Sequence, residues 1–516
     1  MAKRKSELRC CTTELQVSKT KFKPELWNIH KLQPFFPPIE CLFKTEHLDK
    51  LSLGIKFPEH ILDVQEDIVK LSGGSEVQVH PKITMLISPY KWMKGGMSIG
   101  LPMSADIAQK VHQKLQSHNN AGYVGSILSV VLSKCQHFPK VFGTFTGIAK
   151  EHKIDISDDY EDLCDESWFT QNIGKTFDLT LDSEVKQTIQ YSRKARIALE
   201  LGEEIEIGDV QELDVPDVQG TAGELKQVFE DDENTSDSSS VSTSELFEIE
   251  SMPSSFDESW GSEEDDEPFA WATFKDVPVQ LTIMEKLEGT FYELLKNSEH
   301  SKHLAWLGQI IFALAYAQRN FGFTHNDLHG NNIMFQKTPK EYLYYSTEGR
   351  TYKLPTYGYL LKIIDFDRGI GSVKLHGMKE PRLFMSDQFN FCEEAGGQYN
   401  CAPFYTSKVP SIKPNPSFDL TRLATALFWD IYPEGPQYPE YQNYPVFRLF
   451  MKWMSLDNGS VLFFKKNPKV DRFIGFSLYK AIAKYSKNAV PQKEISALDC
   501  YLGECPIEES ILIIED

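Results

Sequence analysis

A polar loop that follows a long apolar helix restricts most strongly what this chain can fold into. From His303 to Asn320, apolar residues recur at three- and four-residue spacing, which predicts a helix with one buried stripe. The stripe consists of Leu304, Leu307, Ile311 and Leu314. The chain then passes through Gly322 into His325-Asn326-Asp327-Leu328-His329-Gly330-Asn331-Asn332. Because clustered polar groups are costly to bury, we expect this loop to carry a site that a buried helix supports.

A second carboxylate, Asp365, follows the buried strand predicted from Tyr359 to Ile364. Phosphoryl transfer needs one carboxylate to orient the acceptor hydroxyl and take its proton, and another, with a neutral amide, to hold Mg²⁺ against the nucleotide phosphates. Asp327 fits the first role, and Asp365 with Asn332 fits the second. The alternative is that these are ordinary capping and turn residues, a common use of Asp and Asn.

The loop resembles the catalytic loop of the protein-kinase superfamily, His-Arg-Asp-Leu-x-x-x-Asn, which Asp-Phe-Gly follows. Asp365-Phe366-Asp367 stands in the second place here. The resemblance implies an α+β, bilobal kinase-like fold with a small sheet-rich N-lobe, a helical C-lobe and insertions. It also implies a site in which Asp327, Asn332 and His325 are catalytic, and Asp365 and Asn332 bind the metal.

Two further segments extend the resemblance. The run from Leu281 to Gly289 is similar to the fifth strand and hinge, which implies that backbone groups of Glu285 and Leu287 meet the adenine. Asp419 is similar to the buried aspartate that opens the central C-lobe helix, which implies that it holds the catalytic loop by accepting backbone hydrogen bonds.

The nucleotide-binding residues of the N-lobe are harder to assign. Gly73 and Gly74 stand where a phosphate-covering glycine loop is expected, but the full G-x-G-x-x-G pattern is absent, and a hairpin turn is the alternative. Lys82, Lys91 and Lys94 are the candidates for the lysine that contacts the phosphates. Lys91 is favoured because it lies seventeen residues beyond Gly74 and directly after an apolar strand.

The chain departs from the family pattern at several positions. From Lys91 to Lys150 it contains no Glu, so the helix carboxylate that usually pairs with the lysine is missing. Asp106, a Gln or backbone group, or a carboxylate from outside this window must replace it. In the motifs, Asn326 replaces an Arg, His329 a Lys, and Asp367 a Gly.

The resemblance implies ATP with Mg²⁺ or Mn²⁺ as cofactors and Ser or Thr hydroxyls of protein substrates as acceptors. Within the superfamily the chain looks like the serine/threonine kinases of large nucleocytoplasmic DNA viruses of the iridovirus type, through runs that include Ser88 to Met93, Lys353 to Tyr359 and Lys362 to Gly369. One alternative is a small-molecule kinase of the aminoglycoside or choline type, whose loops carry the Asp-Leu-His found at Asp327. Another is a pseudokinase or virion structural protein.

Charge and composition restrict the partners. Of the net charge of −20, fifteen carboxylates between Gln227 and Phe274 account for most. We expect residues 230–268 to be a disordered acidic segment, and we expect no nucleic-acid binding, because no basic footprint is visible. No apolar run has the length of a signal peptide core or a membrane span. This favours the host cytoplasm or nucleus, or packaging in a virion among virion components, over secretion.

The expected domain organisation is an N-terminal extension at 1–64, an N-lobe at 65–286 with an insertion at about 150–275, a C-lobe at 287–490 and a tail at 491–516. Besides the elements above, hydrophobic spacing predicts further helices and a hairpin. These are helices at Ala105 to Gln116, Tyr123 to Leu132 and from Phe291, and a hairpin turning at Gly349.

Overall fold

The computed structural model describes residues 17–19, 25–33, 53–95, 105–182 and 269–514, with short gaps at 158, 376–378, 392, 409–411, 457–458, 465–470 and 474. The acidic segment expected at 230–268 lies outside the described residues. Helices and strands are both abundant, so the chain has the expected α+β class. Among the described residues, no helix is both long and apolar enough to cross a membrane.

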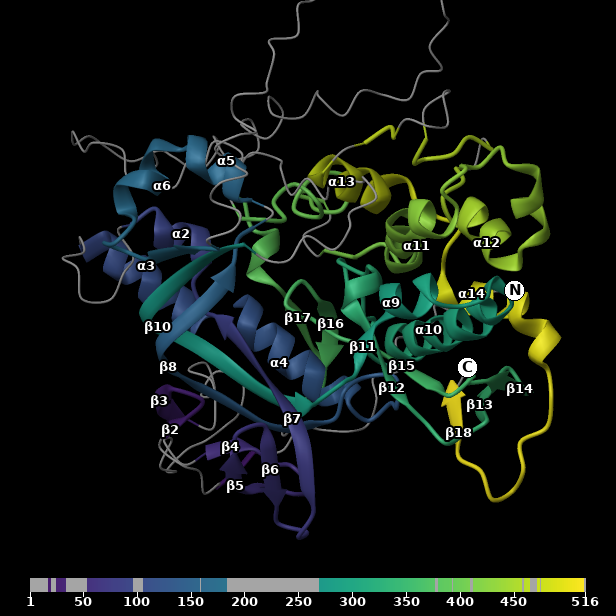
Figure 1. Cartoon of the computed structure of the whole chain (residues 1–516), viewed down its shortest axis with the longest axis horizontal. Helices are drawn as coiled ribbons and strands as arrows, with labels where there is room; N and C mark the ends of the chain where they lie inside the picture. Colours follow the sequence, from purple (N-terminus) through teal and green to yellow (C-terminus); the bar gives the residue numbers. More distant parts are fainter. Residues whose placement is uncertain are drawn as a thin grey trace, which may run out of the picture.

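An eight-stranded sheet dominates the part of the chain before the hinge segment (Figure 1). Its order is β2-β3-β8-β10-β7-β6-β5, with β9 also paired to β10. The strands are β2 (Glu25–Leu26), β3 (Ile29–Gln33), β5 (Ile61–Gln65), β6 (Ile68–Leu71), β7 (Glu76–Met85), β8 (Val141–Asp155), β9 (Asp178–Leu181) and β10 (Ala270–Glu285). A separate pair is formed by β1 (Val17–Lys19) and β4 (Leu53–Ile55). Because β7 and β8 flank β10, its apolar residues from Val277 onward are buried.

Helices complete this part of the molecule. They are α2 (Pro89–Met93), α3 (Ala105–Gln116), α4 (Ala121–Leu132), α5 (Tyr160–Asp165) and α6 (Ser167–Asn172). The helix α4 is apolar on all sides, which is the composition of a buried helix. It contacts β10 on one side and, on the other, β16 (Ile370–Val373) and β17 (Arg382–Met385) of the following half (Figure 1). It therefore joins the sheet to the rest of the chain.

The second half is mainly helical, with short strands at its edges (Figure 1). Its helices are α9 (Phe291–Lys296), α10 (His300–Phe321), α11 (Phe418–Ile431), α12 (Pro445–Trp453), α13 (Phe476–Tyr485) and α14 (Pro491–Glu494). Its 3₁₀ turns are η5 (Gly330–Asn332), η6 (Asp387–Phe389), η7 (Pro439–Asn443) and η8 (Ile495–Tyr501). Its strands are β11 (Gly289–Thr290), β12 (Ile333–Lys337), β13 (Tyr342–Thr347), β14 (Arg350–Pro355), β15 (Tyr359–Ile363), β16 (Ile370–Val373), β17 (Arg382–Met385) and β18 (Ile511–Ile514).

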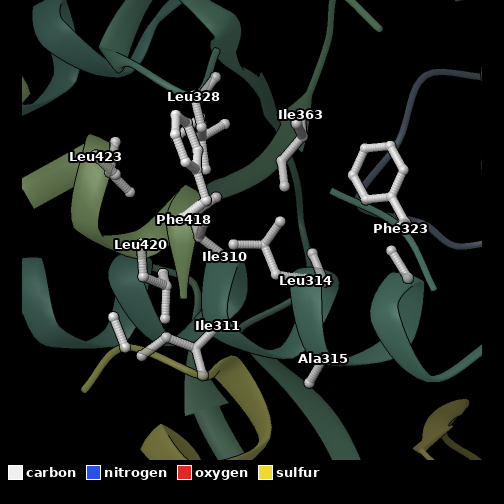
Figure 2. Close-up of a cluster of buried hydrophobic side chains, with 14 of the residues drawn as sticks. Ile310, Ile311, Leu314, Ala315, Phe323, Leu328, Ile363, Phe418, Leu420 and Leu423 are labelled. Carbon is white, nitrogen blue, oxygen red and sulfur yellow. The ribbon is translucent and has the colours of Figure 1, made fainter. Parts of the chain in front are cut away.

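The core of this half lies directly beneath the polar loop. Leu328, in the loop itself, packs among Ile310 and Leu314 of α10, Ile363 of β15 and Phe418 of α11 (Figure 2). All of these side chains are fully buried. Because removing a buried leucine or phenylalanine side chain typically costs about 2–5 kcal/mol, this cluster fixes the loop on α10 and α11.

Parts of the chain expected to be appendages belong to the sheets. The strands β2 and β3, from the expected N-terminal extension, join the eight-stranded sheet through β8. Residues 156–182, from the expected insertion, supply α5, α6 and β9, and β9 pairs with β10. In the expected tail, β18 pairs in parallel with β13. Sequence patterns within these short strands did not reveal such long-range partners.

Candidate active site

The polar loop is held from below by α11. The helix α10 ends at Phe321 and is capped by Gly322, which adopts the left-handed conformation with a φ of 57°. Asp419, in the first turn of α11, is fully buried and accepts hydrogen bonds from the backbone N–H groups of His325 and Asn326, each at 2.9 Å. Two charge-assisted bonds to consecutive amides fix the backbone at the start of the loop.

Asp327 projects from this loop toward two polar partners. Its Oδ1 accepts a hydrogen bond of 2.6 Å from the Tyr479 hydroxyl of α13, and its Oδ2 lies 3.4 Å from Nη1 of Arg368. Burial alone would raise the pKa of this carboxyl, but nearby positive charge, chiefly Arg368, and the Tyr479 hydrogen bond hold the pKa well below its usual value. The side chain is 26% exposed, so an ionised carboxylate remains accessible from solvent.

His325 has a structural task. Its imidazole is fully buried, with Nε2 2.7 Å from the carbonyl oxygen of Ile364 and Nδ1 accepting the backbone N–H of Asp327 at 3.3 Å. The ring also packs edge-on against Phe366. The expectation that His325 is catalytic stays a prediction, and its burial favours a supporting role in the loop. Since both ring nitrogens bond within the protein, His325 positions the loop against the segment after β15.

Asn332 and Asp365 are brought together by strand pairing. Ile333 of β12 faces Ile363 of β15, and the N–H of Ile364 donates to the carbonyl oxygen of Asn332 at 2.9 Å. The two strands therefore end side by side, with Asn332 before one and Asp365 after the other. Asp365 adopts a φ of 62°, an uncommon backbone conformation that is often found at functional sites.

The donor atoms of this pair fit a magnesium ion. The amide nitrogen of Asn332 donates to the backbone oxygen of Asp327 at 2.9 Å, so the side-chain oxygen is the atom that can serve a cation. Asp365 has a side chain that is 45% exposed. Within the described ranges, no cluster of three or more His, Cys, Asp or Glu side chains is arranged to hold a metal. A carboxylate with an amide oxygen suits Mg²⁺, which commonly keeps waters and is completed by substrate phosphates.

Lys82 of β7 reaches across to this pair of strands. Its Nζ lies 2.7 Å from Oδ1 of Asp365 and 2.9 Å from Oδ1 of Asp367. Burial would lower the pKa of Lys82, but the two carboxylates outweigh it, and the pKa lies above its usual value. For Asp365 the charge of Lys82 outweighs burial, so that pKa is lowered, whereas burial dominates at Asp367 and raises its pKa. Among the described residues, Lys82 is the one lysine of the sheet that contacts the cluster of Asp327, Asn332 and Asp365.

Lys91 does not lie at the cluster. Its Nζ forms an ion pair with Glu393, and Lys114 of α3 joins the same group through Glu393 and Asp387. The lysine favoured from the sequence is therefore not the one beside Asp365; Lys82 lies there instead. Lys91 lies in the helix α2 after β7 has ended, so its side chain points to another part of the molecule.

Gly73 and Gly74 also lie apart from the cluster. They form the turn between β6 and β7, where Gly74 adopts a φ of 89°. Lys82 lies six residue steps beyond the start of β7 at Glu76, which corresponds to about 20 Å of extended chain. Gly73 and Gly74 therefore form a hairpin turn, as in the alternative interpretation, and their contact with phosphates stays a prediction.

Glu285 and Leu287, the residues expected at the hinge, lie where β10 ends. The backbone N–H of Glu285 donates to the carbonyl oxygen of Lys140 at 2.9 Å, and the Glu285 carboxylate forms a buried ion pair with Lys362 of β15. Leu287 follows the strand and is half-buried. The segment thus joins the sheet to the helical half at the level of the cluster. Adenine contacts of Glu285 and Leu287 remain predictions.

Sequence reasoning missed several residues of the site. Lys82 stands in Val79-His80-Pro81-Lys82, whose resemblance to the lysine motif Val-Ala-Ile-Lys was visible, and only its spacing from the glycine pair argued against it. Asp367 was seen only as a replaced glycine. Tyr479 and Arg368 gave no local signal, because their contact with Asp327 depends on how distant segments fold.

Comparisons with known proteins find partial matches, several to proteins named as kinases. The serine/threonine-protein kinase haspin of Mus musculus is 40% identical over 60 residues, which is 12% of this chain and 8% of haspin. The Frog virus 3 protein 019R, whose name includes the words serine/threonine-protein kinase, is 24% identical over 132 residues, which is 24% of this chain and 16% of 019R.

A third match is to an uncharacterized protein of Caenorhabditis elegans, at 26% identity over 88 residues, 17% of this chain and 30% of that protein. No protein-family model matches the chain. The chain therefore matches 30% or less of the length of each of these three proteins. The matches indicate a protein-kinase-like relationship over part of the chain.

Proposed function

We propose that this chain is an ATP-dependent protein kinase that transfers the γ-phosphoryl group to Ser or Thr hydroxyls of protein substrates. The observation that carries the proposal is the convergence of Lys82, Asp327, Asn332 and Asp365 from three separate segments, which are β7, the polar loop and the end of β15. A phosphoryl-transfer site needs these four groups, which are a cation for the phosphates, a base for the acceptor, and two oxygen ligands. In this proposal, the eight-stranded sheet is the N-lobe and the helical half the C-lobe of a bilobal kinase fold.

Each residue has a defined task in the proposed reaction. Asp327 is ionised at neutral pH, so it can orient the acceptor hydroxyl and take its proton as the new O–P bond forms. Lys82 places its charge beside the nucleotide phosphates. Asp365 and Asn332 would hold Mg²⁺ or Mn²⁺, which supplies charge neutralisation to the β and γ phosphates when bound.

The match to haspin supports a protein rather than a small-molecule acceptor. The sequence Asp327-Leu328-His329 is also found in small-molecule kinases, so the acceptor must be measured. Radiolabelled ATP offered with a mixture of basic and acidic protein substrates, and separately with aminoglycosides and choline, distinguishes the two. Label on small alcohols alone would reject the protein-kinase proposal.

The proposal is tested with wild type, D327A and D365A. We expect D327A to lower kcat by about a hundredfold or more, because a general base is removed, while ATP–Mg²⁺ still raises the melting temperature. We expect D365A to lose that thermal shift as well as activity. D178A, at a half-exposed position on β9, is the control and should match wild type. Equal phosphorylation by wild type and D327A would refute the base role, and no thermal shift in any variant would favour a pseudokinase or structural protein.

A further inference from the structure

The helix α4 lies against the Lys82 cluster without contributing a carboxylate to it. Its sequence from Ala121 to Leu132 contains no Asp or Glu. Gly125 is the residue of α4 that faces the cluster: a Cβ atom there would lie 2.0 Å from Oδ1 and 3.4 Å from Cα of Asp367. Since glycine inside a helix is destabilising relative to alanine, its presence at this position needs a local reason. The close approach of Asp367 is such a reason.

Asp367 fills the space that Gly125 leaves. One carboxylate oxygen lies 2.9 Å from Nζ of Lys82, and the other accepts a hydrogen bond of 3.0 Å from the Thr84 hydroxyl. Lys82 and Thr84 are two residues apart on β7, so their side chains lie on the same face of the strand. Asp367 is 18% exposed, against 45% for Asp365. Of the two carboxylates on Lys82, Asp367 is therefore the more enclosed and the more firmly held.

We propose that Asp367 is the positioning residue for Lys82. In protein kinases a glutamate on a helix pairs with the lysine. Here α4 has Gly125 beside the cluster, and Asp367, from the segment that also contains Asp365, forms the ion pair instead. The inference rests on the proposed function, because it assigns Lys82 to the nucleotide phosphates. The carboxylate that the sequence left open thus comes from outside the window between Lys91 and Lys150.

A second counter-ion for Lys82 has a chemical consequence. A cation bound at Asp365 competes with Lys82 for that carboxylate. Asp367 would keep Lys82 in place if Asp365 bound the metal, because Lys82 would still have a carboxylate partner. Asp367 also lies only two residues after Asp365 on the same segment. The orientation of Lys82 is then fixed by the segment that binds the metal.

An exchange of the two residues tests this directly. A Cβ on residue 125 would lie no more than 4.9 Å from Nζ of Lys82, given the 2.0 and 2.9 Å distances through Oδ1 of Asp367, so an aspartate there can reach the lysine. The variants are D367N, D367G, G125D/D367G and the neutral control G125N/D367G. We expect D367N and D367G to lower kcat/KM for ATP at least about tenfold, since one member of an enclosed charge pair is removed. We expect G125D/D367G to recover most of that loss and G125N/D367G to recover none.

A second measurement does not depend on activity. A double-mutant cycle of K82M, D367N and K82M/D367N, followed by urea unfolding, should show that the two single effects are not additive. Additive effects would overturn the pairing, and full activity of D367N or equal rescue by G125N/D367G would overturn the positioning role. If wild type transfers no phosphate while the cycle shows coupling, the proposed function fails and the Lys82–Asp367 pair stands.

Discussion

At the scale of single residues, both carboxylate oxygens of Asp327 have a side-chain partner within the protein. Tyr479 donates to one oxygen and Arg368 lies near the other. A carboxylate offers about four lone-pair sites, so an acceptor hydroxyl can still bond to it while these contacts persist. The Tyr479 ring lies in turn against the guanidinium of Arg422, at 4.9 Å from its centre. We interpret Tyr479 as a residue that fixes the direction of the Asp327 carboxylate.

The variant Y479F should therefore lose activity. Without the hydroxyl the carboxylate gains rotational freedom and loses a hydrogen bond to a charged group, a contact that contributes about 1.5–3 kcal/mol, so we expect kcat/KM for the acceptor to fall roughly tenfold or more. The measurement is steady-state transfer at saturating ATP. Y485F is the matched control on the same helix, because the Tyr485 hydroxyl has no hydrogen-bond partner among the described residues. Faster turnover by Y479F would instead mean that the tyrosine competes with the acceptor.

The residues of the site differ in how far the sequence could predict them. Asp327, Asn332 and Asp365 were predicted because local order along the chain, a helix, a loop and a strand, already places them together. Lys82 was passed over because it follows Gly73 and Gly74 too closely, although Val79-His80-Pro81-Lys82 resembles the lysine motif. Beyond Gln78, β7 pairs only with β10, so Pro81 lies on a locally unpaired edge, where proline is tolerated. The strand continues through Lys82 for that reason.

At the scale of elements, one buried ion pair connects the end of β10 with β15. Lys362 and Glu285 have side chains that are 3% and 9% exposed, and Glu285 also accepts the backbone N–H of Lys140 at 2.8 Å. The pair thus links the sheet, the hinge segment and the strand that leads into Asp365. Removing one partner of a buried pair leaves the other charge without compensation.

We expect K362M to lower the free energy of unfolding by about 3–5 kcal/mol, and E285M/K362M to recover much of that loss, because no buried charge is left unpaired. Urea unfolding followed by circular dichroism measures both. The control is K286M, which breaks the pair of Lys286 with Asp67 at side chains that are 51% and 39% exposed. An exposed pair contributes at most about 1 kcal/mol. If K362M and K286M lowered the free energy of unfolding by the same amount, the buried pair of Lys362 and Glu285 would not be what joins these elements.

Among the helices and strands, too, those specified by neighbouring residues could be predicted, whereas pairings between distant segments could not. The helix α9 and the hairpin of β13 and β14 were predicted because each is specified by neighbouring residues, with Gly349 at a φ of 73° in the turn. The pairing of β18 with β13 joins residues more than 160 positions apart and is parallel. Such a pairing depends on tertiary packing and has no local sequence signal.

At the scale of the whole molecule, buried histidines couple stability to pH. His137 bridges the carbonyl oxygen of Leu361 and the Tyr345 hydroxyl, at 2.9 and 2.8 Å, and burial lowers its pKa to about 4. Burial likewise lowers the pKa of His303, in the first turns of α10, to about 4. Both values lie below the 6.5 of an ordinary histidine, so between pH 6.5 and 4 these two histidines bind more protons in the unfolded chain than in the folded one. By linkage, their contribution to stability falls as the pH decreases through that interval.

Each of these histidines should contribute a slope of roughly 1.4 kcal/mol per pH unit within the interval. Buried carboxyls with raised pKa values, such as Asp387 and Asp419, act in the opposite direction, because the folded state binds their protons more readily. The histidine contribution is therefore measured as a difference between variants.

The free energy of unfolding of wild type, H137Q and H303Q is determined in urea at pH 7.5, 6.0 and 5.0. We expect the decline toward pH 5.0 to be shallower in either variant than in wild type. H112Q, at an exposed position on α3, is the control. Parallel declines in all four proteins would show that the acid sensitivity of this fold comes from groups other than His137 and His303.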